Sequence, residues 1–469
     1  MNRILLAILF FLSFNTLAQQ HEKSDLVLTQ LTDFFNKDQF PELYNQLSPE
    51  FRTQQTEQSI TAFYKTGLKS VLGKIVSWKY QENVEAWNIY LVNFERGQQE
   101  LKLGVTAEGK IGGMLWKIPK EKKADRDPAT VKTNNPKQTK IQLYIDSLAL
   151  GYLKNPNNNS LSIAVVNDGK TEIFFYGETT KGNGLLPDRN SIYEIGSVSK
   201  TFTAIMIAHA VNEGKILLND DIRKYLPGSY PDLQFNGKPI TILSLANQTS
   251  GFPRLPENFF QHPAYKESDP YQAYSKEMIY QYLANFKLSQ LPGTKAEYSN
   301  FGFAVLGTIL ENVYKVPLDK LLLEMITVPL KMKATGYTVA PLYIPLKTTG
   351  YTAEKVAPYW DMAAYRAAGG IKSSLNDMII YLQENMKNTN KDFSLSHQQS
   401  VNINDHNCGL AWMITPVKNN KKLIWHNGAT AGFSSFAGFT QDQKKGIVVL
   451  NNSDSTVDEL AVKILSSLL

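Results

Sequence analysis

Ser197 and Lys200 are the residues of this 469-residue chain whose spacing most directly suggests chemistry. Residues 200–212 carry apolar side chains at helical intervals, which predicts a helix beginning close to Ser197. One turn of that helix brings the serine and the lysine to the same face, with Cβ atoms roughly 5–6 Å apart. A desolvated lysine amine can accept a hydroxyl proton and so create a nucleophile. On this segment alone, a helix-capping serine followed by a solvated lysine is an equally good interpretation.

Tyr298 and Asn300 follow a predicted turn in the middle of the chain and precede an apolar helix expected over residues 301–313. A phenol and an amide on one short turn can relay a proton and hold a substrate amide. Taken alone, this pair is more typical of a helix cap. Its value for function depends on a second segment that lies close by in the fold.

His426-Asn427-Gly428 ends one predicted strand and enters a turn-and-strand run over residues 429–436. Glycine lets the backbone approach a ligand closely, and the histidine adds a donor or acceptor beside it. The other five histidines have no metal-ligand spacing, and the single cysteine excludes a disulfide framework or a cysteine-based zinc cluster. We therefore expect neither a metal nor a cofactor. A metallohydrolase would also need a motif such as His-Glu-x-x-His, which the sequence lacks.

These segments lie in a region of about 330 residues, 141–469, whose ends read as strands and whose middle reads as helices. Strands are expected at 161–167 and 170–176, and again at 409–415, 422–426, 433–439 and 446–451, with helices at 141–153 and from 457. Strands from both chain ends suit one antiparallel sheet with helices packed around it, beside a helical region. The expected class is α+β.

Three further segments precede this region. Residues 1–18 have a basic start, a short apolar run and a small-residue cleavage site, which predicts a secretory signal peptide. The apolar run is too short to span a bilayer, so a membrane anchor is the weaker alternative. We expect a secreted or periplasmic protein with no stable anchor after cleavage. Residues 22–118 predict a small α+β domain of helices followed by three strands, and its pattern resembles the cystatin-like or NTF2-like small domains.

The net charge of +6 comes largely from residues 119–140, a polar segment that we interpret as a basic linker. Because the excess charge lies in one short stretch rather than on a folded face, the sequence does not favour nucleic-acid binding. The expected partner is a small-molecule or peptide substrate, which could derive from peptidoglycan. The oligomeric state cannot be read from the sequence.

The ordered set Ser-x-x-Lys, Tyr-x-Asn and His-x-Gly resembles the class C β-lactamase-like and penicillin-binding serine hydrolases. Further blocks over residues 141–469 resemble the family in the same order: Glu194-Ile195-Gly196, Thr249-Ser250-Gly251, Pro292-Gly293, Ala368-Gly369-Gly370 with Ser373 and Asp377, Gly409-Leu410-Ala411-Trp412, and Gly432-Phe433-Ser434. The resemblance implies a β-lactamase/transpeptidase-like fold that forms an acyl-enzyme and needs no metal.

Each site residue takes a role from this resemblance. Ser197 would attack a carbonyl, while Lys200 and Tyr298 would share the work of general base and proton shuttle, with the base itself left open. Asn300 would hold the substrate amide, and His426 would assist the tyrosine or meet a substrate carboxylate. Gly428 and Ala429 would border the substrate. The backbone N–H groups of Ser197 and Ala429 would form the oxyanion hole.

Two positions depart from the family pattern. His426 stands where many relatives have lysine, which removes a fixed positive charge and disfavours a dedicated β-lactamase. Gln248 stands where relatives often have histidine before Thr-Ser-Gly, so that histidine's role is absent. The sequence predicts an exported serine acyl-hydrolase, with a D-amino-acid peptidase or an esterase ahead of a β-lactamase. The alternative is a non-catalytic sensor or cell-wall binding module of the same fold. Selectivity would depend on loops 252–269 and 337–360.

Overall fold

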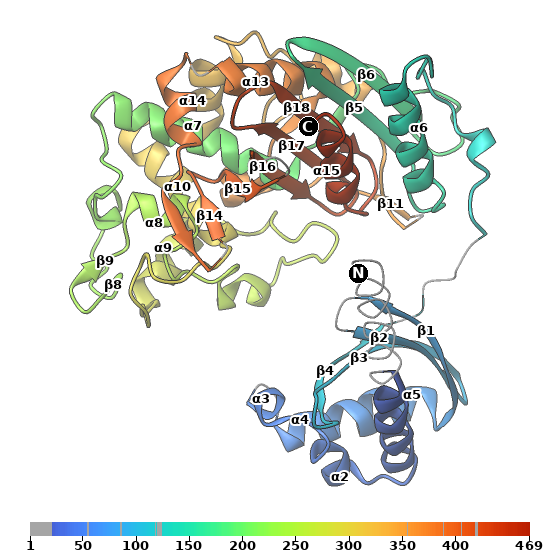
Figure 1. Cartoon of the computed structure of the whole chain (residues 1–469). Coiled ribbons are helices and arrows are strands. Elements are labelled where there is room, and N and C mark those ends of the chain that lie inside the picture. Colours follow the sequence, from blue (N-terminus) through green and yellow to red (C-terminus); the bar gives the residue numbers. More distant parts are fainter. Residues whose placement is uncertain are drawn as a thin grey trace, which may run out of the picture. The chain divides into compact units, whose positions relative to one another are not determined.

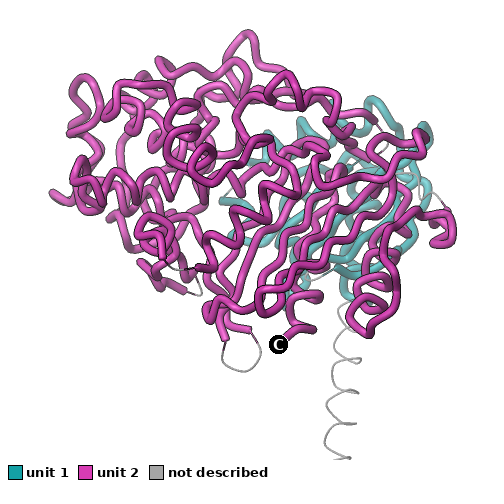
Figure 2. The backbone as a smooth tube through the Cα atoms, turned by 90° about the horizontal axis from the view of Figure 1, so that it is seen from above, with its two compact units in different colours: residues 1–123 teal, residues 124–469 magenta. Residues whose placement is uncertain are grey.

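The structure is a computed structural model that describes residues 21–53, 56–84, 87–117, 119, 124–353, 355–387, 389–404, 406–417 and 421–469. The chain divides into two compact units, residues 1–123 and 124–469 (Figure 2). The predicted signal peptide, residues 1–18, lies outside the described residues. Within the described ranges, no helix combines the length and the apolar character needed to cross a membrane.

The first unit places helices against one curved antiparallel sheet (Figure 1). Its helical segments are residues 21–36, α2 (Phe40–Tyr44), α3 (Pro49–Arg52), α4 (Glu57–Ala62), residues 63–69 and α5 (Ser70–Leu72). Its strands pair in chain order, as β1 (Ile75–Val84), β2 (Trp87–Phe94), β3 (Gly97–Val105) and β4 (Ile111–Lys117). The core lies between the two layers, where Leu31 and Phe35 of the first helix meet Tyr90, Val92 and Leu101 of the sheet.

The three strands predicted for residues 22–118 do not include β1. Most residues of β1 are exposed or half-buried, and Val76 is 67% exposed. A strand with so little buried surface shows only weak alternation, which is the signal that sequence reasoning uses. The structure therefore has a four-stranded meander where three strands were expected.

The second unit is built on an eight-stranded antiparallel sheet in the order β13-β14-β15-β16-β17-β18-β5-β6. Its first two strands by sequence are β5 (Ser160–Asn167) and β6 (Lys170–Gly177). The others are β13 (Val401–Ile403), β14 (His406–Cys408), β15 (Met413–Pro416), β16 (Lys422–Ala429), β17 (Ser434–Thr440) and β18 (Lys445–Asn451). Ile447 of β18 pairs with Val165 of β5. The predicted sheet built from both chain ends, and the α+β class, are confirmed.

Helices cover both faces of this sheet (Figure 1). The terminal helices α6 (Lys140–Leu153) and α15 (Asp458–Ser466) share one apolar cluster with the sheet, including Ile145, Ile163 and Ile464. The opposite cluster contains α7 (Ser199–Asn212) and α13 (Leu375–Lys387). It continues into the helical region, which contains α8 (Ile242–Ala246), α9 (Lys276–Asn285), α10 (Asn300–Tyr314) and α11 (Leu318–Leu322).

Part of the expected linker, residues 119–140, packs onto the second unit instead. The backbone N–H of Gly177 donates to the carbonyl of Lys132, and Asn134 exchanges hydrogen bonds with Phe175. The side chain of Asn135 also donates to the hydroxyl of Tyr176, at 2.7 Å. The prediction of a free linker was wrong here because it weighed only apolar content. Backbone and asparagine hydrogen bonds to the edge strand β6 hold this segment.

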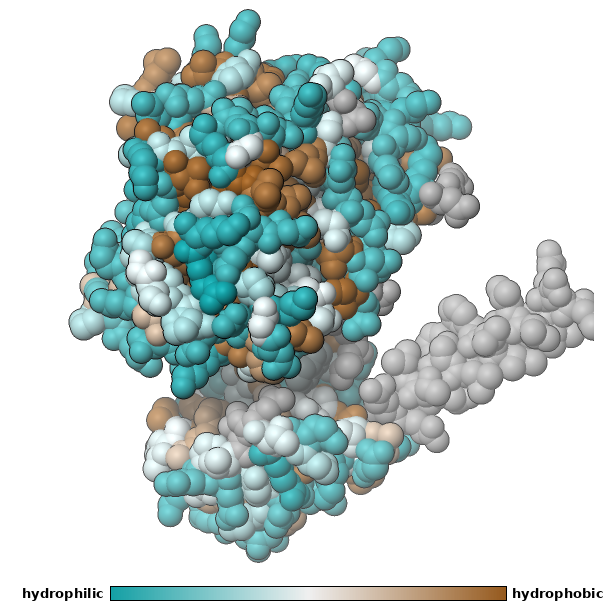
Figure 3. Space-filling view, turned by 90° about the vertical axis from the view of Figure 1, so that its left-hand side faces the viewer, coloured by the Kyte–Doolittle hydropathy of each residue, from teal (hydrophilic) through white to brown (hydrophobic). Residues whose placement is uncertain are grey.

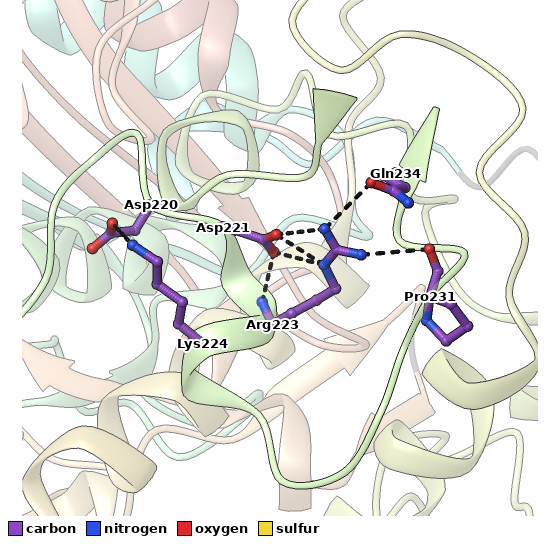
Figure 4. Close-up of polar contacts among 6 residues, drawn as sticks. All are labelled: Asp220, Asp221, Arg223, Lys224, Pro231 and Gln234. Atoms are coloured by element: carbon purple, nitrogen blue, oxygen red, sulfur yellow. Dashed lines mark hydrogen bonds and ion pairs between the residues drawn. The ribbon is translucent and has the colours of Figure 1, made fainter. Parts of the chain in front are cut away.

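The connection from α7 to α8 is stiffened by a polar network around a short 3₁₀ turn, η4 (Ile222–Tyr225) (Figure 4). Asp221 caps this turn by accepting from the backbone N–H of Arg223, and it also accepts from the guanidinium of that residue. The same guanidinium reaches the carbonyl of Pro231 and the side chain of Gln234.

On the helical face of the second unit, polar side chains predominate and apolar ones gather in smaller groups (Figure 3).

Helix α7, which contains Lys200, is buried along nearly its whole length, so the surrounding packing holds it in place. Phe202 stacks on Tyr381 of α13 with ring centroids 3.8 Å apart, and the hydroxyls of Thr201 and Tyr381 lie 2.7 Å apart. Tyr381 in turn stacks on the buried Trp412. A helix buried on all sides is held by packing rather than by an exposed polar face.

Replacing Phe202 with alanine is expected to lower the free energy of unfolding by about 3–5 kcal/mol, because it leaves a cavity against Tyr381. Chemical denaturation of the purified chain measures the change. Leu217→Ala is the matched control, since Leu217 is 61% exposed and its loss should change stability by no more than about 0.5 kcal/mol. Equal effects of the two variants would contradict the packing role of Phe202.

Candidate active site

Ser197 lies on a tight turn between a short strand and a buried helix. β7 (Ile192–Glu194) leads into the 3₁₀ turn η3 (Gly196–Val198), and α7 follows directly. Gly196 has a φ of +48°, in the left-handed region that glycine adopts most easily. The turn leaves Ser197 partly exposed in a pocket of about 220 Å³. Its N–H belongs to the first helical N–H groups, which have no acceptor within the helix.

Lys200 is fully buried, and its amine contacts three oxygen atoms. Nζ lies 3.0 Å from Ser197 Oγ, 2.7 Å from Asn300 Oδ1 and 2.6 Å from the carbonyl oxygen of Ala368. The amide and carbonyl oxygens can only accept, so each takes one N–H of the amine. A neutral amine has only two such hydrogens, and its lone pair then remains for the hydroxyl of Ser197.

Burial lowers the pKa of Lys200 well below its ordinary value, and the positive charge of Arg254 lowers it further. Both effects disfavour the charged amine because it has lost its water and faces another cation. Among the described residues, no acidic side chain raises the pKa of Lys200 to oppose these effects. The amine is therefore suited to act as a base.

Tyr298 lies immediately before helix α10, where Ser299 caps the helix by accepting from the N–H of Gly302 at 2.8 Å. The Tyr298 hydroxyl hydrogen-bonds to Ser197, and Lys200 Nζ lies 4.9 Å from the centre of the Tyr298 ring. Burial raises the pKa of Tyr298 to about 12, although the hydrogen bond to Ser197 and the charge of Arg254 oppose this. At neutral pH the phenol therefore carries its proton.

Asn300 is the first residue of α10, and both ends of its amide are occupied. Its oxygen accepts from Lys200, and its Nδ2 donates to the hydroxyl of Tyr271 at 3.2 Å. The family resemblance implied that this amide holds the substrate. In the structure it also orients the amine of Lys200, a contact that no spacing rule supplies.

Gln248 positions the turn that carries Tyr298. Its Oε1 accepts from the backbone N–H of Ser299 at 2.7 Å, and its carbonyl accepts from the N–H of Glu297 at 2.8 Å. The backbone of Gln248 has a φ of +65°, in the left-handed region. From the sequence we inferred only the loss of a histidine at this position. The glutamine has a positioning contact of its own.

His426 lies on strand β16, with its ring centroid 6.4 Å from that of Tyr298. Burial lowers the pKa of His426 to about 3, and the nearby Lys200 contributes to this shift. The carbonyl of Asn427 lies 2.6 Å from Nδ1, and a carbonyl only accepts, so Nδ1 carries the hydrogen. The imidazole is thus neutral and adds no positive charge to the site.

Gly428 allows strand β16 to pack directly against the turn of Ser197. A Cβ at Gly428 would lie 2.0 Å from the carbonyl oxygen of Ile195 and 2.9 Å from the N atom of Ser197. A Cβ at Gly196 would lie 2.6 Å from the N atom of Ala429. Two glycines therefore bring the N–H groups of Ser197 and Ala429 to one place. Their role as oxyanion donors stays a prediction that this geometry permits.

The structure brings all the predicted side chains to one site and adds three that the sequence did not single out. Arg254, Tyr271 and Trp360 line the same pocket as Ser197 and Asn300. The rings of Tyr271 and Trp360 lie 5.4 Å apart. Arg254 and Trp360 fall within the loops flagged for selectivity, 252–269 and 337–360. Spacing could flag these loops, whereas only the tertiary fold places individual residues in the pocket.

A serine on a helix-starting turn, a buried amine in contact with its oxygen, and a protonated phenol beside both define a serine hydrolase. The chain belongs to the Beta-lactamase family, whose model matches residues 145–466. D-alanyl-D-alanine-carboxypeptidase/endopeptidase AmpH of Escherichia coli K12 is 33% identical over 222 residues, which cover 47% of this chain. The match spans 56% of that relative's length. A beta-lactamase of Pseudomonas fluorescens is 27% identical, over 67% of this chain and 94% of its own length.

Solved structures show the same fold. The beta-lactamase/D-alanine carboxypeptidase from Pseudomonas syringae superposes with a TM-score of 0.62 at 22% identity, over 70% of this chain and 98% of its own. Its counterpart from Yersinia pestis, complexed with citrate, gives a TM-score of 0.58 at 22% identity and covers 70% and 95% of the two chains. The predicted β-lactamase-like fold is confirmed for the second unit. The cystatin-like or NTF2-like likeness of the first unit stays a prediction.

Replacing Gly428 with alanine is expected to lower the acylation rate of Ser197 by about 10²–10³, the range found when an oxyanion donor is lost. The added methyl group must push strand β16 away from the turn of Ser197. Labelling kinetics with a fluorophosphonate measure the effect. Gly151→Ala in α6 is the matched control, because a Cβ there meets open space. Unchanged labelling of Gly428→Ala would contradict the proposed packing.

Proposed function

We propose that this chain is an exported serine acyl-hydrolase that cleaves an amide or an ester through an acyl-enzyme on Ser197. The observation that carries the proposal is the 3.0 Å contact between Ser197 Oγ and the fully buried amine of Lys200. Family membership supports hydrolase activity of this type. The predicted signal peptide at residues 1–18 supports export.

We assign the general base to Lys200 and the proton relay to Tyr298. The pKa of Lys200 is lowered, so that the amine can accept a proton, whereas the phenol of Tyr298 holds its proton up to about pH 12. In acylation, Lys200 takes the Ser197 proton as Oγ bonds to the carbonyl carbon. The N–H groups of Ser197 and Ala429 receive the developing negative charge.

The tetrahedral intermediate then collapses, and the carbon–nitrogen or carbon–oxygen bond to the leaving group breaks. Tyr298 donates its hydroxyl proton to the leaving atom and takes the proton held by Lys200 in its place. In deacylation, water takes the place of the leaving group and loses its proton along the same path in reverse. Oγ regains its proton and the acid product leaves, so the enzyme returns to its starting state.

The proposed substrates are D-amino-acid peptides and small esters ahead of β-lactams. AmpH is named as a D-alanyl-D-alanine carboxypeptidase and endopeptidase, and other relatives are named as beta-lactamases. The neutral His426 leaves the third motif without the fixed cation that a lysine would provide. Asn300 would present the second N–H of its Nδ2 to the substrate, while its oxygen accepts from Lys200 and orients the base.

Incubation with a fluorophosphonate or a penicillin is expected to add one acyl or phosphonyl group to Ser197, detected by intact mass and peptide mapping. Ser197→Ala should take up no label. Lys200→Met should stay folded and label about 10²–10⁴ times more slowly, because the methionine fills the space without providing a base. Lys215→Ala, on the exposed end of the same segment, is the control and should label normally. Normal labelling of Lys200→Met would remove the role given to Lys200.

The pH profile of kcat/KM gives a second test. Activity requires neutral Lys200, so the rate should rise with pH through the lowered pKa of that amine. It should fall only near pH 12, where Tyr298 loses its proton. The rising limb should keep its midpoint in His426→Gln, because an imidazole with a pKa of about 3 does not titrate in this range. A limb near pH 6.5 that disappears in His426→Gln would show that the histidine is the base.

A further inference from the structure

The catalytic groups leave the pocket without a cation of their own. Burial disfavours the charged form of Lys200, and both nitrogens of His426 belong to a neutral ring. Among the described residues that line the pocket, Arg254 alone has a charged side chain. The positive charge that many relatives have on the strand of the third motif would here come from a different loop.

The backbone of Arg254 is held by hydrogen bonds, whereas its guanidinium has no polar partner among the described residues. Its carbonyl accepts from the N–H groups of Asn300 and Phe301, at 3.1 and 3.2 Å, which ties the residue to the start of α10. Its side chain is exposed, and the guanidinium lies over the ring of Tyr298, with Cζ 5.1 Å from the ring centre. Within the described part of the chain, the guanidinium forms neither an ion pair nor a hydrogen bond.

Other arginines of the same unit show how a structural arginine differs. Arg223 pairs with Asp221 at 2.6 Å, and Arg366 pairs with Asp319 at 2.7 Å. Arg254 instead directs its charge at the catalytic groups, since it lowers the pKa of Lys200, Tyr298 and Tyr271. An unpaired guanidinium at the rim of a pocket that holds the nucleophile is an open anion-binding group, because its planar fork matches a carboxylate.

We propose, on the basis of the proposed function, that Arg254 binds a free carboxylate of the substrate and so selects acyl substrates that carry one beside the scissile bond. The fork of Arg254 would donate two parallel hydrogen bonds to that carboxylate. The ring of Tyr298 would support the guanidinium from below and keep it close to Ser197. Arg254 is thus a specificity-determining residue in a position that the three motifs do not mark.

The test compares pairs of substrates that differ only in this charge. The pairs are N-acetyl-D-alanyl-D-alanine with its C-terminal amide, and 3-acetoxybenzoate with 3-acetoxybenzamide. The wild type is expected to favour the carboxylate member of a pair by about tenfold or more in kcat/KM. Arg254→Gln should reduce this preference to near one, and Arg254→Lys should keep part of it. Added salt should weaken the preference in the wild type.

The ratio within each pair is the diagnostic quantity, because removal of Arg254 also raises the pKa of Lys200 and so changes both rates together. Arg189→Gln is the matched control: it removes the same charge from an exposed residue outside the pocket, and should leave the ratio unchanged. Equal rates for both members in the wild type, or a preference that survives Arg254→Gln, would overturn the proposal. A neutral fluorophosphonate separates the two levels, since failure to label Ser197 would refute the proposed function itself.

Discussion

The site depends on a lysine amine that is fully buried and that meets neutral oxygen acceptors among the described residues. Taking an ammonium group out of water is costly, and the described surroundings of Lys200 offer two neutral acceptors instead of a carboxylate. The amine can therefore be neutral at a pH where a surface lysine is charged. The packing around α7 and α10 serves this end, because a helix that shifted enough to admit water would restore the charge.

The motifs could be predicted because their spacing is local. Ser197 and Lys200 lie within one helical turn, and Tyr298 and Asn300 lie at one helix start, so sequence rules place each pair correctly. The family resemblance linked the three motifs to one site. The sheet joined from both chain ends followed from the strand pattern. Strand β1 escaped detection because most of it faces solvent and lacks a clear alternation.

The rest of the site arises from contacts between segments that are distant in sequence. Arg254 reaches Tyr298 only because its carbonyl is bound to the N-terminus of α10. Gln248 looked like the loss of a histidine, yet its amide holds the backbone of Ser299 through a left-handed turn. Neither contact has a sequence signature. The burial that neutralises His426 is also a property of the folded site, since composition gives no pKa.

The sheet that joins the two ends of the second unit also determines when the enzyme can become reactive. Ser197 and Lys200 lie at the start of α7, whereas Ala429, whose backbone packs against the same turn, ends strand β16, which pairs with β17 and through β18 with β5. We expect these long-range pairings to form late, because closing so long a loop costs entropy before any contact repays it. A nascent or partly folded chain is therefore expected to carry an unreactive Ser197. We expect Ser197 to become reactive only once these last strands have paired.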